Sequence, residues 1–279
     1  MEELDGRQVG VDEITSLTLT GYDHFTTMRV EGGAIRGLAL HFARLARDCR
    51  ADFGTELDVD HVRQKLSRRL DLTGNENDVV ARITVFDPDL SLTHPAGPAA
   101  PRILVTTRPA PEPPQGPLRV RPVRHLRQVA GVKHTGLFDS RHLRRAAQLK
   151  GLDDALFHGD ELWISEGATW KVGFFDGRRL VWPQGEHLPG VTDSLLTQAH
   201  ESFFLLTVML DHLPSTEAAF ATNAAVGVRP ISAIGAVPFV MDHPVLAELR
   251  RRYAEITAEE PRPPASARAA PSTSATTAN

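Results

Sequence analysis

The sequence predicts an α+β protein with two domains, and three observations support this fold class. The chain has 279 residues, which is long for one compact domain and sufficient for two. β-rich segments alternate with helical periodicities along most of the chain. Residues 109–117 read Pro-Ala-Pro-Glu-Pro-Pro-Gln-Gly-Pro, which sustains neither a helix nor a β-ladder because proline lacks an amide donor. We therefore expect a smaller N-terminal domain over residues 1–108, a linker over 109–116 and a larger C-terminal domain over 117–257.

The smaller domain is expected to combine a short antiparallel meander with two helices. Apolar residues at helical spacing predict helices over residues 38–50 and 59–70. A Glu31-Gly-Gly turn follows the first two strands. The strands expected from β-propensity cover residues 17–20, 25–30, 79–86 and 103–107.

The larger domain is expected to contain a helix over residues 140–150, closed by Gly151, and short strands around it. These strands cover residues 118–123, 155–157, 162–164, 172–175 and 180–182. Residues 258–279 are rich in Pro, Ala, Ser and Thr, and they contain too few large apolar side chains to offset the entropy of ordering. We expect this tail to be disordered.

The composition excludes several classes of protein. Hydrophobic residues make up 41% and charged residues 24%, as in ordinary globular proteins. A net charge of -4 provides no general attraction to nucleic acid. The single cysteine, Cys49, cannot form an intrachain disulfide, and no apolar stretch approaches the roughly 20 residues that span a bilayer. A cytoplasmic protein without membrane or nucleic-acid partners is the expectation.

Common catalytic motifs are missing from the sequence. It contains no G-x-x-x-x-G-K-[ST], G-x-G-x-x-G, G-x-S-x-G, H-E-x-x-H or C-x-x-C pattern. The twelve histidines are scattered without the spacing of metal ligands, so no metal site is expected.

Six short segments, in a particular order, carry a family resemblance. They are Phe-Thr-Thr-Met-Arg-Val at 25–30, His-Phe-Ala-Arg-Leu at 41–45, Gly-Val-Lys-His at 131–134, Ser-Glu-Gly-Ala at 165–168, Leu-Pro-Gly-Val-Thr at 188–192 and Thr-Asn-Ala-Ala at 222–225. The ordered set resembles the fold-type IV enzymes that depend on pyridoxal 5'-phosphate (PLP), namely class IV aminotransferases and aminodeoxychorismate lyases. The resemblance implies a D-amino acid aminotransferase-like fold, PLP between the two domains, and a homodimer.

Lys133 is the central candidate for catalysis. A lysine that reacts with an aldehyde must be partly desolvated, and Lys133 follows the apolar stretch Ala130-Gly-Val. The resemblance makes Lys133 the Schiff-base lysine and the group that moves a proton at the substrate α-carbon. It also implies that Glu166 pairs with the pyridine nitrogen, so that the ring accepts electrons, and that Arg44 reaches the phosphate.

The remaining cofactor candidates follow the same resemblance. Val191 and Thr192 stand where a helix begins, and the free amides of a helix N-terminus suit a phosphate. Thr222 and Asn223 are implied as a second phosphate-facing element. The candidates for substrate contact are Thr27, Arg82, Arg124 and His94.

Four positions depart from the family pattern. Asp193 replaces a frequent arginine after the Pro-Gly-x-Thr segment, and Trp170-Lys171-Val172 occupies the stretch where an asparagine is common. Phe138 replaces the tyrosine of many aminotransferases, which lyases also lack. The loop at 87–95 carries Asp87 and Asp89 where lyases have an arginine- and glycine-rich loop, although Arg82, Arg124 and Arg127 can compensate.

These features predict a class IV aminotransferase-like enzyme that acts on an amino acid or related amine, with a keto acid as the amino-group partner. An aminodeoxychorismate lyase, which releases pyruvate and 4-aminobenzoate, is the alternative within the family. A catalytically silent homologue that acts as a binding protein is the alternative from another class, but retention of Lys133 and Glu166 disfavours it.

Overall fold

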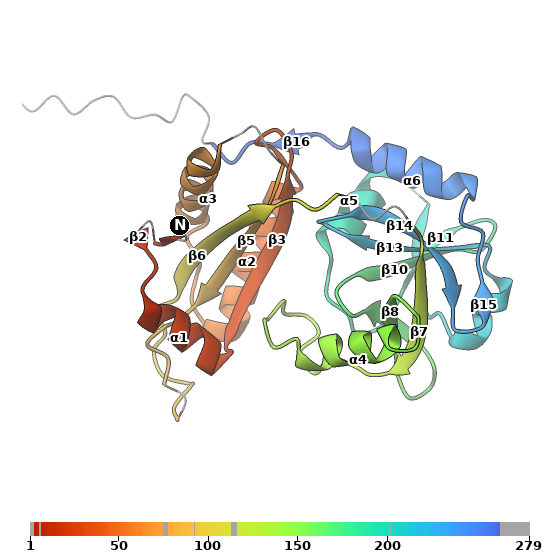
Figure 1. Cartoon of the computed structure of the whole chain (residues 1–279), viewed down its shortest axis with the longest axis horizontal. Coiled ribbons are helices and arrows are strands. Elements are labelled where there is room, and N and C mark those ends of the chain that lie inside the picture. The colour runs from red at the N-terminus through yellow and green to blue at the C-terminus, as the bar shows by residue number, and fades with distance from the viewer. Residues whose placement is uncertain are drawn as a thin grey trace, which may run out of the picture.

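The computed structural model describes residues 3–5, 7–74, 78–91, 93–112, 116–200 and 202–262. Within these residues the chain forms two lobes, each built on its own large β-sheet (Figure 1). Helices and strands are mixed in both lobes, which confirms the predicted α+β class. None of the described helices has the length and apolar character needed to cross a membrane.

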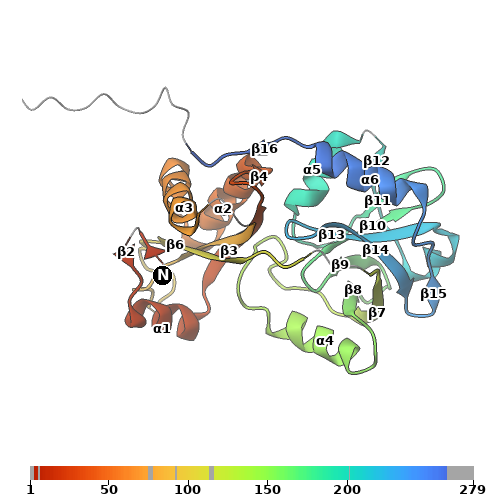
Figure 2. The same ribbon diagram turned by 45° about the horizontal axis from the view of Figure 1, so that its top comes forward.

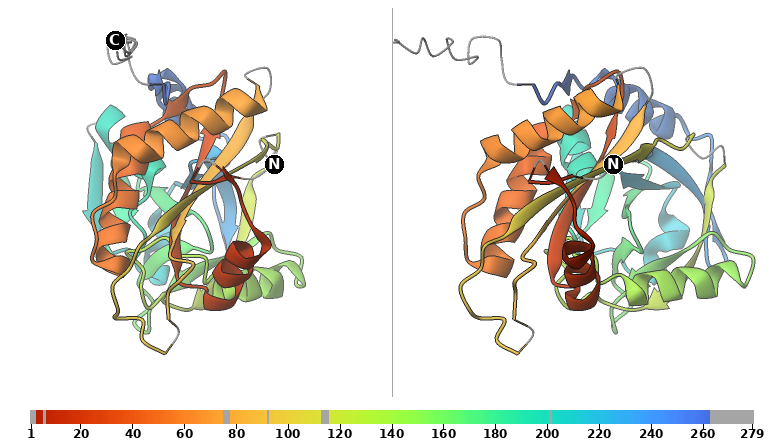
Figure 3. Two further views of the ribbon diagram at one scale, coloured as in Figure 1. Left: turned by 90° about the vertical axis from the view of Figure 1, so that its left-hand side faces the viewer. Right: turned by 60° about the vertical axis from the view of Figure 1, so that its left-hand side comes forward.

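The N-terminal lobe contains a five-stranded sheet with strand order β2-β1-β6-β5-β3 among the described residues. Its strands are β1 (Glu3–Leu4), β2 (Arg7–Gln8), β3 (Asp23–Val30), β5 (Val79–Phe86) and β6 (Arg102–Pro109). Helices α2 (Leu38–Phe53) and α3 (Val59–Thr73) cover one face (Figure 3). Apolar side chains such as Leu45, Leu66 and Ile83 fill the space between helices and sheet, and each is 0% exposed.

Residues 17–20 are helical, so the predicted first strand is wrong. They form the second half of α1 (Val11–Thr20), which begins after Gly10 and ends at Gly21 with a φ of 57°. Val11, Ile14 and Leu17 recur every three residues, and this helical spacing outweighs the β-propensity of the two threonines. Leu17 packs beside Phe86 and Leu104 of the sheet.

The C-terminal lobe contains a nine-stranded sheet in the described part of the chain, with order β12-β11-β10-β13-β14-β7-β8-β9 and β15 paired to β14. The strands are β7 (Leu118–Arg124), β8 (Asp154–His158), β9 (Ile164–Gly167), β10 (Lys171–Phe175), β11 (Leu180–Pro183), β12 (Phe203–Leu206), β13 (Ala218–Asn223), β14 (Gly227–Ile234) and β15 (Val237–Pro238). The accompanying helices are α4 (Phe138–Gln148), α5 (Val191–Ala199), the 3₁₀ helix η1 (Leu210–Ser215) and α6 (Pro244–Glu255). Strand β9 also lies near β10, so the sheet curls around its core.

Two predicted boundaries in this lobe shift. Helix α4 begins at Phe138 and ends at Gln148, whereas the prediction covered 140–150. The strand expected at 162–164 begins only at Ile164, because Leu162 has a φ of 64°, which belongs to a turn and not to a strand.

The tail expected to be disordered from residue 258 is ordered at its start. Ala258–Glu259 forms β16, which pairs antiparallel with β4 (Ile35–Arg36) of the N-terminal lobe (Figure 2). The Arg262 guanidinium pairs with the Asp71 carboxylate at 2.7 Å. Backbone pairing, one surface ion pair and the burial of Pro261 hold this segment, and a composition poor in large apolar residues did not reveal it. Residues 263–279 of the predicted tail lie outside the described residues.

Candidate active site

A cavity of about 310 Å³ lies between the two lobes and receives side chains from both. All seven residues expected to contact the cofactor line it, and so do two of the four substrate candidates. These nine residues are Lys133, Glu166, Arg44, Val191, Thr192, Thr222, Asn223, Thr27 and Arg82. Segments more than 100 residues apart in the sequence therefore meet in one site.

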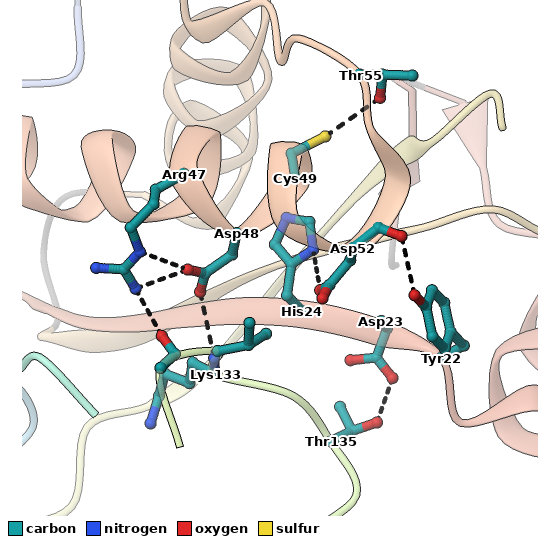
Figure 4. A network of polar contacts seen from close by, with 12 residues as sticks. Tyr22, Asp23, His24, Arg47, Asp48, Cys49, Asp52, Thr55, Lys133 and Thr135 are labelled. Atoms are coloured by element: carbon teal, nitrogen blue, oxygen red, sulfur yellow. Dashed lines mark hydrogen bonds and ion pairs between the residues drawn. The ribbon is translucent and has the colours of Figure 1, made fainter. Parts of the chain in front are cut away.

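The loop that carries Lys133 joins β7 to α4 of the C-terminal lobe but is bound to the N-terminal lobe (Figure 4). The backbone N–H of Lys133 donates to Asp48 Oδ2 of α2 at 3.2 Å, and its carbonyl accepts from the N–H of Phe25 on β3 at 2.8 Å. Arg47 donates to Asp48 at 2.6 Å and to the Gly131 carbonyl at 2.9 Å. The main chain at Lys133 is thus fixed on both sides.

The side-chain amine of Lys133 is set in an environment that favours its neutral form. Nζ lies 4.9 Å from the centre of the Phe25 ring. Burial, followed by the positive charges of Arg44 and Arg127, lowers the pKa of Lys133 to about 7. A large fraction of this amine is unprotonated near neutral pH, as attack on an aldehyde requires.

Glu166, on β9, is a buried carboxylate with two partners. Arg127 Nη1 lies 3.4 Å from Oε1, and the Leu188 N–H donates to Oε2 at 3.2 Å. Burial raises the pKa of Glu166, and the positive charge of Arg127 opposes this rise. Glu166 is therefore suited to pair with a cationic or hydrogen-bonding group in the cavity.

One end of the cavity is suited to an anion. Helix α5 begins at Val191, and its N-cap Gly190 offers no side-chain hydrogen bond to the first amides. The buried hydroxyls of Thr192 and Thr222 have no hydrogen-bond partner among the described residues. Burial lowers the pKa of Arg44 to about 10, so this guanidinium keeps its charge at neutral pH. Buried hydroxyls without partners beside a helix N-terminus and an arginine fit a phosphate group.

The opposite wall comes from β3 and β5. Thr27 and Arg82 face each other across the antiparallel ladder, so both side chains project from the same face of the sheet. The Arg82 guanidinium lies 3.7 Å from the centre of the Phe25 ring. The preceding residue of β3, Thr26, points to α2 instead, where its hydroxyl contacts His41 Nδ1 at 2.7 Å.

Arg124 and His94 do not line this cavity, so the expectation that they do is wrong. Arg124 is the last residue of β7, and its side chain is 73% exposed and paired with Asp160. Alternation along the strand turns it away from the partly buried Val123 and toward solvent. His94 is exposed in the loop that joins β5 and β6.

Several residues that line the cavity were not expected there as site residues. They include Phe25, Arg108, His134, Lys171 and Asp193, and Arg127, named above as a compensating cation, lines the cavity with them. The signal for Lys171 was present in the sequence, since a lysine inside the apolar strand Trp-Lys-Val-Gly-Phe-Phe must be buried beside a partner. Among the described residues, no group of His, Cys, Asp and Glu side chains has the arrangement of a metal site.

The sequence matches the model of a known protein family. The model of the amino-transferase class IV family matches residues 23–234. The chain belongs to this family. The match includes most of both lobes and the whole cavity lining, and it confirms the resemblance to fold-type IV PLP enzymes, the expectation of an enzyme and that of PLP as the cofactor.

Solved structures of class IV proteins share the fold at low sequence identity. The branched-chain aminotransferase of the thermophilic archaeon Thermoproteus uzoniensis has a TM-score of 0.81 and 18% identity, and the match covers 91% of this chain and 93% of that one. The PLP-bound form of a hypothetical aminotransferase from Mycobacterium tuberculosis has a TM-score of 0.77 and 16% identity, with 91% and 98% covered. A Legionella pneumophila protein provisionally assigned as a 4-amino-4-deoxychorismate lyase has a TM-score of 0.74 and 20% identity, with 90% and 96% covered. No curated protein matches the chain.

Proposed function

We propose that this class IV enzyme is aminotransferase-like and acts on an amino acid or a related amine, with Lys133 as the residue that binds PLP covalently. The observation that carries the proposal is the amine of Lys133, buried in one cavity with Glu166 and an anion-binding end. A lysine kept partly neutral presents the free amine that a nucleophile or a general base requires.

The residues of the cavity fit PLP. Arg44, Thr192 and Thr222, together with the first amides of α5 at Val191, offer a cation and donors that suit the phosphate. Asn223 lies beside Thr222 and completes this end. Glu166 is the carboxylate available to the ring nitrogen. When bound, PLP supplies an aldehyde that condenses with amines and a pyridine ring that accepts electrons.

The chain's own groups then handle protons and orientation. Lys133 is the base that takes and returns a proton at the substrate α-carbon, because its main chain is fixed and its amine is partly neutral. Phe25 packs against the lysine and excludes water from one side. Arg82 and Thr27 offer a cation and a hydroxyl for a substrate carboxylate.

The lyase reaction is the second candidate, and one observation favours it. Phe138, at the position of the tyrosine found in many aminotransferases, is 78% exposed and does not line the cavity. The fold likeness to the Legionella pneumophila protein is compatible with either reaction. A leaving group on the β-carbon of the substrate diverts the same proton abstraction to pyruvate release.

We also infer a cytoplasmic homodimer with the domain division at residues 109–116. The absence of an intrachain disulfide partner for Cys49 supports a reducing compartment. Sedimentation or light scattering of the purified protein tests the dimer. A monomer with full activity would contradict it.

The experiment that tests the covalent role of Lys133 is an absorbance spectrum of the purified protein with added PLP, recorded beside Lys133→Ala. A sample reduced with borohydride and digested for peptide masses identifies the modified residue. We expect a pH-sensitive visible band in the wild type and an adduct on Lys133. No band would contradict the proposal and favour a silent homologue, and an adduct on another lysine would contradict the role of Lys133.

Products separate the two reactions. Formation of 4-aminobenzoate from aminodeoxychorismate identifies the lyase. Transfer of an amino group from an amino acid to an added keto acid, without pyruvate release from aminodeoxychorismate, identifies the aminotransferase.

A further inference from the structure

Two of the positions that depart from the family pattern are partners in the structure. Lys171 Nζ lies 3.9 Å from Asp193 Oδ2, and the side chains are 5% and 12% exposed. Both residues line the cavity between the lobes. A lysine and an aspartate that are buried together must offset each other, because an isolated buried charge is strongly unfavourable.

The pair lies at the anion-binding end of the cavity. Lys171, the first residue of β10, faces Thr222 of β13 in the antiparallel register, so their side chains share one face and their Cβ atoms are about 5 Å apart. Asp193 follows Thr192 in the first turn of α5. The hydroxyls of Thr222 and Thr192 are among the buried groups that have no hydrogen-bond partner in the described part of the chain. The ion pair therefore connects β10, which pairs with β13 at Thr222, to α5, which carries Thr192.

Asp193 places a negative charge where a phosphate is expected to bind. Its carboxylate lies against Gly190, the N-cap of α5, so closely that a Cβ at this position would collide with Oδ1. A carboxylate at a helix N-terminus interacts with the same positive end of the helix dipole as a phosphate does. Oδ1 has no hydrogen-bond partner in the described part of the chain, so a neighbouring cation is needed to balance it.

Lys171 is that cation. Arg44 also acts on Asp193 electrostatically, but its Nη2 already donates to Thr26. Burial lowers the pKa of Lys171 to about 8, and the Asp193 carboxylate opposes this effect, so the ammonium form still predominates at neutral pH.

We propose that Lys171 is an additional phosphate-binding cation of the cofactor site, which offsets Asp193 and so allows this end of the cavity to accept the phosphate dianion. The inference rests on the proposed PLP function, and it adds a pair of residues that the family pattern does not supply. Lys171 here has a positioning and binding role and takes no part in proton transfer.

The test compares PLP with pyridoxal, which lacks the phosphate. Dissociation constants for both are measured from the visible band in the wild type, Lys171→Met, Asp193→Asn and the double variant, with melting temperatures recorded for each. The dissociation constant of pyridoxal divided by that of PLP, called the ratio below, isolates the contribution of the phosphate.

We expect Lys171→Met to weaken PLP by about 10- to 100-fold, the range of one charge-assisted hydrogen bond, and to leave pyridoxal nearly unchanged. Asp193→Asn removes the competing carboxylate and should raise the ratio, because PLP then binds more tightly relative to pyridoxal. In the double variant the ratio should return close to the wild-type value, because the Lys171 ammonium and the Asp193 carboxylate are both removed. A merely structural role of the pair would weaken both ligands together.

Each failure has its own signature. A wild type that shows no band with either ligand overturns the proposed function and this inference. A wild type that binds PLP while Lys171→Met keeps the ratio unchanged overturns the inference alone. If Lys171→Met does not fold, the double variant and Asp193→Asn still test the proposal. A ratio that does not rise in Asp193→Asn contradicts it.

Discussion

The backbone N–H of Lys133 donates a hydrogen bond to the buried carboxylate of Asp48, 3.2 Å away on a helix of the other lobe. Asp48 is 0% exposed and also accepts from Arg47. Lys133, the residue proposed to bind PLP, is thus held in register with the N-terminal lobe by its main chain.

Asp48→Ala should lower both stability and cofactor binding. It removes the acceptor of two donors, and a buried donor without a partner costs about 1–3 kcal/mol. We expect a fall of this size in the free energy of unfolding, measured by urea titration, and slower appearance of the PLP band. Asp48→Asn keeps one acceptor oxygen and is the matched control, with an intermediate effect. Equal band formation in Asp48→Ala and the wild type would contradict the positioning role.

The reaction of the apo-protein with PLP should depend on pH through the amine of Lys133. Its pKa of about 7 means that the neutral, reactive form increases as pH rises through this value. We expect the rate of band formation in stopped-flow mixing to rise between about pH 6 and about pH 8 and then to level off. A rate that continues to climb toward the ordinary lysine range would show that the amine is not perturbed.

The same shift has a consequence for the stability of the apo-protein. Lys133 loses its proton near pH 7 in the folded chain and near 10.5, the usual value, in the unfolded chain. Between these values the unfolded chain binds more protons, so this group's contribution to the unfolding free energy rises with pH. Lys133→Met should therefore stabilise the apo-protein most below pH 7, with an advantage that shrinks toward pH 10.5. Urea unfolding at both ends of this window measures the difference, and a constant difference would contradict it.

Arg82→Ala should weaken substrates that carry a carboxylate. Loss of one charge-assisted contact corresponds to about 10- to 100-fold in kcat/KM. An amine without a carboxylate provides the control and should be affected little. Arg82→Lys keeps the charge but loses the planar stacking on Phe25, so it should recover only part of the activity. Equal losses for both substrates would place Arg82 in a structural role.

Truncation tests the short strand at the end of the described chain. A protein ending at residue 257 loses β16 and the Arg262–Asp71 ion pair, whereas one ending at residue 262 keeps both. We expect the shorter form to unfold at a lower temperature, by a few degrees, and the longer form to match the full chain. Equal melting temperatures for the two truncated forms would show that the strand contributes nothing.

The α+β class, the positions of α2, α3 and α4, and half of the described strands could be predicted from the sequence, which also supplied the candidate residues of the cofactor site. The elements follow from local periodicity and from turn residues such as Gly151, whereas the candidate roles of Lys133 and Glu166 follow from the ordered set of motifs that resembles the family. The helix at 11–20 was missed because its threonines favour strands while its apolar spacing favours a helix.

Which of these residues lie together in the cavity depends on how the two lobes pack. Whether Arg82 faces the cavity and Arg124 faces solvent depends on strand register and sheet packing, neither of which leaves a local signal. The Lys171–Asp193 pair and the Lys133–Asp48 hydrogen bond join residues that are 22 and 85 positions apart. Such contacts arise from the way two sheets and their helices pack, because burial forces each charge to find a partner wherever the fold supplies one.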